Sequence, residues 1–182
     1  MKRNKKFVRN CIIIFSILFS IYYFGNFYFS KEKCLEDMMI SLYLEDYEVI
    51  DELKVGNVIH YVTVNREEKA VSIIDIVEYP FLYRKQEISK DEIVKKFNEN
   101  YRYDAYGYGY TGFGRTDLFI IYRNDKDIQR VVFENENGDT KIFENWNGDF
   151  CIAHHNYPNV ENWYLKVYDK DGNFVDYYED LN

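Results

Sequence analysis

Cys151, His154 and His155 lie within five residues of one another and bring one thiol and two imidazoles close together. A thiol beside an imidazole base is the arrangement of a cysteine nucleophile, and the same groups are ligands for zinc. No HExxH or CxxC motif accompanies them, and the sequence indicates no third group that would orient a base. We therefore expect no catalytic residue and no metal site, and we expect unreactive cysteine and solvated histidines.

A second candidate is a stretch of alternating glycine and tyrosine. Tyr106, Tyr108 and Tyr110 are separated by single glycines, so in an extended segment their three rings lie on one side. Together with Tyr103 and Phe113 they could stack on a sugar, a peptide or a partner surface. The sequence thus predicts a ligand-binding face formed by these five aromatic residues.

Two alternatives compete with this interpretation. Residues 107–112 match the letters G-x-G-x-x-G of a nucleotide-binding turn, but they follow a predicted helix and precede a predicted strand, which is the wrong context. We expect no cofactor. Glycine alternating with aromatic residues also occurs where a bent edge strand packs its rings over its own sheet.

Three acidic turns suggest calcium at first sight, since Asp, Asn and Glu cluster beside Gly138, Gly148 and Gly172. If each glycine is taken as the glycine at position 6 of an EF-hand loop, the first calcium ligand would be Phe133, Phe143 or Val167. None of these residues has a side-chain oxygen. Asn-Gly and Asp-Gly instead favour the tight turns of β-hairpins. The recurrence predicts successive hairpins of an antiparallel meander.

Cysteine usage leaves one question open. Cys34 and Cys151 are the two cysteines that follow the N-terminal apolar segment, and a disulfide between them is one arrangement. Free thiols buried as small hydrophobes are the other. His60 alternates in phase with Val58 and Val62, which favours a hydrogen-bonded core residue over a metal ligand.

The N-terminal segment from Cys11 to Phe29 carries no charge and would span about 28 Å as a helix, at roughly 1.5 Å per residue. Five basic residues precede it. The sequence predicts a cytoplasmic tail (1–10), an uncleaved single-pass signal anchor in the cell membrane (11–30) and an extracytoplasmic domain (31–182). A cleaved signal peptide is less favoured because Tyr23 and Tyr28 occupy positions that need small residues.

The charge balance of residues 31–182 is strongly acidic, with 18 basic and 31 acidic residues and a formal charge of −13. Such a field repels phosphate backbones, so we expect no nucleic-acid partner. It favours cationic partners, metal ions or simply solubility. The region is also rich in tyrosine and poor in proline, which predicts one folded domain.

The pattern of apolar residues predicts an α+β fold. Leu35, Met38, Met39 and Leu42 form one stripe of a short helix that begins near Glu32. Another helix is predicted to begin at Lys90. Ser89 and Glu92 would form its capping box, and Ile88 and Ile93 its hydrophobic staple. Its core face would consist of Ile93, Val94, Phe97 and Tyr101. The predicted strands are residues 58–64, 70–77, 117–123, 128–134, 140–144, 163–168 and 174–178. We expect an antiparallel, meander-like sheet of about five to seven strands.

These observations lead to three functional hypotheses. The first is a non-enzymatic, membrane-anchored module that binds a protein or an envelope component. The second is a module for an envelope glycan or peptide built around Tyr106, Tyr108 and Tyr110. The third is a hydrolase that uses Cys151 or a histidine.

Overall fold

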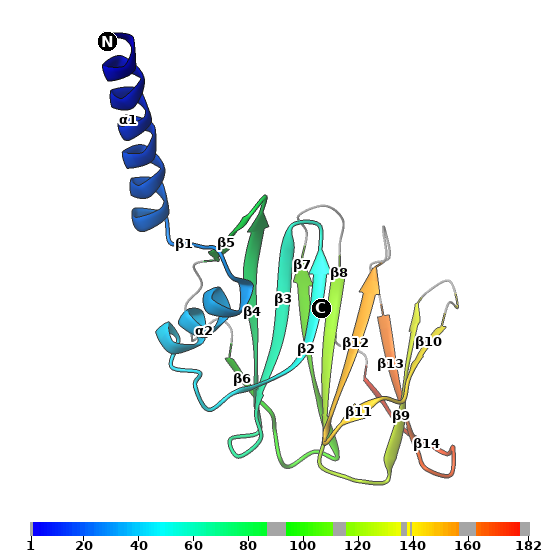
Figure 1. The fold of residues 1–182 in the computed structure, drawn as a ribbon. Helices are drawn as coiled ribbons and strands as arrows, with labels where there is room; N and C mark the ends of the chain where they lie inside the picture. The colour runs from blue at the N-terminus through cyan, green and yellow to red at the C-terminus, as the bar shows by residue number, and fades with distance from the viewer. Residues whose placement is uncertain are drawn as a thin grey trace. The chain divides into compact units, whose positions relative to one another are not determined.

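The computed structural model describes residues 2–86, 94–110, 116–135, 138, 140–156 and 163–178. These residues form two helices and fourteen strands, and the strands pair in mostly antiparallel sheets (Figure 1). The predicted α+β class with antiparallel sheets is confirmed. The prediction of one meander-like sheet of about five to seven strands is wrong, because the described strands form three sheets. The chain divides into two compact units, Met1–Asn65 with Ser72–Val94 and Arg66–Val71 with Lys95–Asn182.

The first unit is built around one sheet in the order β1-β5-β4-β3-β2, with β6 paired to β4. Its elements are α1 (Lys2–Phe24), β1 (Phe27–Tyr28), α2 (Lys31–Ser41), β2 (Glu48–Val55), β3 (Val58–Asn65), β4 (Ala70–Tyr79), β5 (Leu82–Lys85) and β6 (Val94–Lys96). Strands β3 and β4 correspond to the predicted strands 58–64 and 70–77, and they are neighbours in the sheet. Both faces of β3 are buried, so this strand lies at the centre of the unit.

Helix α1 is shorter in its apolar part than the predicted anchor. It ends at Phe24, Asn26 has a positive φ of 52°, and Phe27 and Tyr28 pair with β5 as strand β1. The uncharged helical part, residues 11–24, would be about 21 Å long, against a hydrocarbon core about 30 Å thick. Among the residues that the structure describes, no helix is long and apolar enough to cross a membrane.

The predicted transmembrane anchor over residues 11–30 is therefore wrong, and with it the assignment as a single-pass signal anchor. The physical reason is that the end of the predicted span, Phe27 and Tyr28, satisfies its backbone in a sheet rather than in a helix. The extracytoplasmic location of residues 31–182 stays a prediction.

Helix α2 confirms the predicted short helix near Glu32. Ser30 is its N-cap, and its hydroxyl accepts a hydrogen bond from the Lys33 N–H at 3.3 Å. The helix closes where Tyr43 adopts a positive φ of 55° and the Leu44 N–H donates to the Met39 carbonyl at 2.9 Å. These caps fix both ends of the helix.

A buried polar pair joins β3 and β4. Nδ1 of His60 lies 2.7 Å from Oδ1 of Asp75, and both side chains are almost fully buried. Burial of a polar group is costly unless it is hydrogen-bonded, so this contact satisfies two groups at once. The prediction that His60 is a hydrogen-bonded core residue is confirmed.

The second unit contains two four-stranded sheets, in the orders β11-β12-β8-β7 and β10-β9-β13-β14. Its strands are β7 (Tyr103–Tyr110), β8 (Thr116–Arg123), β9 (Ile128–Asn135), β10 (Thr140–Phe143), β11 (Trp146–Asn147), β12 (Phe150–Asn156), β13 (Trp163–Asp169) and β14 (Phe174–Tyr178). One hydrophobic core contains side chains from both sheets. The rings of Phe119 on β8 and Phe133 on β9 lie 4.7 Å apart between their centroids.

Cys151 belongs to this core, together with Ala153. Phe150, the preceding residue, is also buried and packs with Tyr122 and Phe97 on the other side of the sheet. The small side chains of Cys151 and Ala153 leave room for the aromatic rings of the facing sheet.

The predicted hairpin turns are confirmed at the backbone. Gly138, Gly148 and Gly172 all have positive φ, at 83°, 64° and 82°. They lie between β9 and β10, β11 and β12, and β13 and β14, and each of these strand pairs is antiparallel. The acidic repeat is therefore a turn signal.

The predicted helix from Lys90 is not formed in its described part, residues 94–101. Residues 87–93, which include Ser89, Glu92 and the helix start, lie outside the described residues. Val94–Lys96 is strand β6, and Phe97 is a buried aromatic residue rather than part of a helical face. Pairing with the sheet has overridden the local helical pattern.

Removal of the Asp75 carboxylate should destabilise the protein markedly. We expect Asp75→Ala to lower the free energy of unfolding by about 2 to 4 kcal/mol, because His60 then loses a buried hydrogen bond. Urea unfolding followed by circular dichroism measures the loss. The matched control is Glu78→Ala on the same strand, whose pair with Lys54 is partly exposed and should contribute less than about 1 kcal/mol. Equal losses would contradict a stabilising buried pair.

A strained turn offers a second prediction. Phe81 follows Pro80 between β4 and β5, has a positive φ of 70° and is 91% exposed. This position favours glycine, and so exposed a ring gains little from packing. Phe81→Gly should therefore raise the free energy of unfolding by about 0.5 to 1 kcal/mol in the same assay. Phe81→Ala keeps the Cβ and should change little, and a glycine variant less stable than the alanine variant would refute the strain.

Candidate functional site

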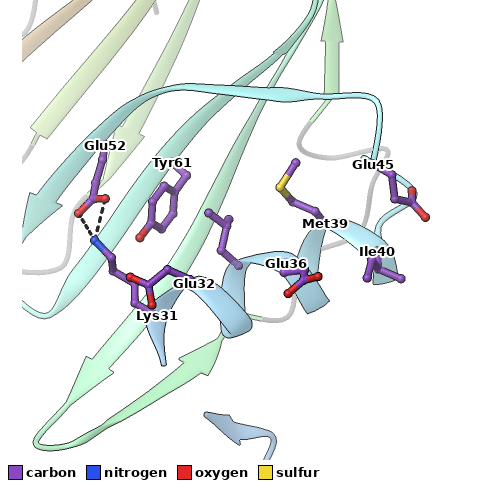
Figure 2. Close-up of a pocket in the computed structure, with 9 residues that line it drawn as sticks. Lys31, Glu32, Glu36, Met39, Ile40, Glu45, Glu52 and Tyr61 are labelled. Carbon is purple, nitrogen blue, oxygen red and sulfur yellow. Dashed lines mark hydrogen bonds and ion pairs between the residues drawn. The ribbon is translucent and has the colours of Figure 1, made fainter. Parts of the chain in front are cut away.

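A groove of about 600 Å³ lies in the first unit, between α2 and the strands β2 and β3 (Figure 2). The nine residues that line it come from α2, the segment after it and the two strands. They are Lys31, Glu32, Leu35, Glu36, Met39, Ile40, Glu45, Glu52 and Tyr61. The groove therefore combines an apolar lining with an acidic rim.

The apolar lining follows from the two parallel rows of apolar residues on α2. Cys34, Met38 and Leu42 are spaced by four residues and are buried. Leu35 and Met39 form the neighbouring row, one residue further along, and are only half-buried. The helix thus turns one row into the core and leaves the other row to line the groove.

Contacts on the opposite side of α2 help to hold this orientation. The Tyr28 hydroxyl donates to Oδ2 of Asp37 at 2.5 Å, and Lys85 on β5 forms an ion pair with the same carboxylate. These contacts lower the pKa of Asp37, first through its hydrogen bond from Lys85. The pKa of Tyr28 is raised, first by burial and then by its bond to Asp37. The network ties the helix to β1 and β5.

Four glutamates and one lysine provide the charges of the groove. Glu32, Glu36 and Glu45 are exposed on the rim, where Figure 2 draws them around the helix. Lys31 is the lining cation, and its ammonium lies 2.9 Å from each carboxylate oxygen of Glu52. This hydrogen bond raises the pKa of Lys31. The groove keeps an excess of negative charge.

Tyr61 is the most deeply buried residue of the lining, with 3% of its surface exposed. The Lys31 ammonium lies 5.9 Å from the centroid of its ring, within cation–π distance. Its hydroxyl oxygen is buried and close enough to Lys31 and Glu52 for both to affect its pKa, but it makes no hydrogen bond of standard geometry with a described residue. Burial raises the pKa of Tyr61 to about 12, with the charge of Glu52 adding to the rise, so it is a neutral phenol at physiological pH.

The predicted ligand-binding face of aromatic residues belongs to the second unit and not to the groove. Tyr103–Tyr110 is strand β7 at the edge of its sheet, so this stretch is not a loop. Tyr103 is part of the hydrophobic core of the second unit, while Tyr106 and Tyr108 are half-buried on the other face of the strand. The side chain of Tyr110 and all of Phe113 lie outside the described part of the chain. A ligand-binding role for these five residues stays a prediction.

The predicted cysteine and histidine group does not resemble a nucleophile where it is described. Cys151 is 1% exposed, and burial raises its pKa to about 12. The side chains of His154 and His155 lie outside the described part of the chain. Cys34 is also buried, with its pKa raised to about 11 by burial, and both cysteines are free thiols in the structure. A disulfide between them stays a prediction.

Sequence reasoning identified Leu35 and Met39 but assigned them to the core face of the helix. It missed the groove because Glu45, Glu52 and Tyr61 are separated from α2 in sequence and come together only when β2 and β3 form. A signal was present in the width of the apolar stripe, since two adjacent rows are more than one buried face requires. Among the described residues, no group of three or more His, Cys, Asp or Glu could hold a metal ion.

The groove has to be interpreted from its own chemistry. Comparison of the chain with protein-family models, with curated proteins and with solved structures found no match.

The burial of the two thiols predicts their reactivity. In the native chain at pH 8, iodoacetamide should modify the exposed Cys11 and leave Cys34 and Cys151 intact, because the thiolate is the reactive form. A pKa of about 11 or about 12 leaves roughly one thiol in a thousand or fewer ionised at that pH. Mass spectrometry of the modified chain counts the labels. Native modification of Cys151 as fast as that of Cys11 would contradict its burial.

Unfolding the same sample in denaturant without reductant tests the disulfide. Two further labels are expected, one on each buried thiol. Their absence would show that Cys34 and Cys151 are bridged in that preparation.

Proposed function

We propose that this chain is a non-enzymatic binding module that holds a short segment of a partner protein in the groove beside α2. The observation that carries this proposal is the combination of an open apolar lining with an acidic rim. Apolar side chains supply most of the free energy of binding, whereas surrounding charges select the partner and speed its approach.

The size and shape of the groove support a peptide segment as its occupant. A volume of about 600 Å³ falls within the range of small-ligand sites and accommodates two or three side chains. Ile40 is 50% exposed beside the half-buried Leu35 and Met39, so an apolar side chain could cover all three. Four carboxylates against one ammonium favour a segment that carries positive charge.

The protonation states of the described candidate groups support a binding role over a catalytic one. The described candidate nucleophile, Cys151, is buried and protonated at neutral pH. In the groove, the pKa of Glu32 is lowered by its hydrogen bond from Ser30, and that of Lys31 is raised. Both groups are therefore held in their charged forms, which suits recognition more than proton transfer.

A random peptide library displayed on phage and selected for binding to the full chain tests this proposal. The selected peptides should combine lysine or arginine with a large apolar residue. Ile40→Glu should weaken their binding about tenfold or more, because it places a charge where an apolar side chain must be buried.

Ile142→Glu on β10 is the matched control. It replaces the same residue type at similar exposure, 56% against 50%, in the other unit. It should leave the affinity of the selected peptides unchanged. Equal affinity of the Ile40 and Ile142 variants would show that binding does not use the groove.

A further inference from the structure

We propose that Lys31 occupies, within its own chain, the position that a lysine or arginine side chain of the partner takes when the partner binds. This inference rests on the proposed function, since it names the chemical group that the groove recognises. It assigns Glu52 and Tyr61 as the cation site and Lys31 as its internal, replaceable occupant.

The contacts of Lys31 are those that an external cation would make. Its ammonium is shared between the two oxygens of Glu52, at 2.9 Å each, and lies 5.9 Å from the Tyr61 ring centroid. A carboxylate and an aromatic face together form a recognised site for ammonium and guanidinium groups. Figure 2 shows Lys31, Glu52 and Tyr61 converging at one end of the groove.

The Tyr61 hydroxyl provides an independent observation. It is buried within the lining next to Lys31 and Glu52, yet it makes no hydrogen bond of standard geometry with a described residue, although buried hydroxyls normally do. Its raised pKa keeps it protonated and able to accept a hydrogen bond as well as to donate one. A guanidinium or ammonium, or a backbone carbonyl of the same peptide, could form a well-aligned hydrogen bond with this hydroxyl.

Lys31 is held weakly enough to be replaced. The side chains of Lys31 and Glu52 are 30% and 42% exposed, and an ion pair at such exposure changes an equilibrium constant by about fivefold at most. Lys31 begins α2 at the edge of the groove, so its flexible side chain can turn outward into water without moving the helix. The partner's cation would then pair with Glu52 while its apolar neighbours cover Leu35, Met39 and Ile40.

Two tripeptides test this inference, acetyl-Leu-Lys-Leu-amide and acetyl-Leu-norleucine-Leu-amide, which differ only in the ammonium group. Dissociation constants are measured by nuclear magnetic resonance titration of the isotope-labelled full chain. Lys31→Ala should bind the lysine tripeptide about fivefold more tightly than the unmodified chain does and should bind the norleucine tripeptide with unchanged affinity.

Glu52→Gln removes the charge of the site while keeping its shape, and it should abolish the preference for the lysine tripeptide. Lys54→Ala is the control, because Lys54 lies on the same strand but pairs with Glu78 and does not line the groove. It should leave both affinities unchanged. Circular dichroism spectra that match the unmodified chain verify that each variant is folded.

If the ratio of the two affinities is the same in Lys31→Ala as in the unmodified chain, the inference is overturned. Lys31 would then be only a structural contact between α2 and β2. Failure of the proposed function gives a different result, in which neither tripeptide shifts the signals of α2 and the inference is rejected with it. Binding of both tripeptides to the groove with equal affinity would retain the groove and reject the cation site.

Discussion

The burial of one row of side chains on α2 determines the chemistry of the first unit. Cys34, Met38 and Leu42 are turned into the core, and this fixes the rotation of the helix about its axis. Leu35 and Met39, one position further along, must then face the space beside β2 and β3. Glu32 and Glu36 take the rim for the same reason. A rotation of one residue, about 100°, would bury the lining and close the groove.

Much of the fold could be predicted from local sequence signals. The positive φ of Gly138, Gly148 and Gly172 follows from Asn-Gly and Asp-Gly turns, which specify hairpins whatever surrounds them. Helix α2 could be predicted because its periodicity and its N-cap act within a few residues. Two helix predictions failed because the residues pair with strands far away in the sequence. Residues 27–28 pair with β5, and Val94–Lys96 pairs with β4 instead of continuing a helix. In both places a long-range pairing overrides an apolar pattern that fits a helix equally well.

The candidate site was less predictable than the fold, for the same physical reason. Tyr61 and Glu52 lie on neighbouring strands, and Lys31 reaches them from a helix about twenty to thirty residues earlier in the chain. No spacing rule connects such residues before the sheet forms. Sequence reasoning instead considered residues close together in the chain. These were the tyrosines of β7, which it predicted to bind a ligand, and Cys151 with its histidines, which it expected to be unreactive. The cysteine faces a core between two sheets, where desolvation makes a thiolate costly.

Hydrogen–deuterium exchange of the full chain is the most direct test of the groove as a binding site. The probe is a lysine- and leucine-rich peptide at saturating concentration, and the readout is the change in protection of each segment. The account predicts slower exchange in Lys31–Ser41 and in the adjoining parts of β2 and β3, with no change in Tyr103–Tyr110. Protection confined to Tyr103–Tyr110, or absent from α2, would contradict it.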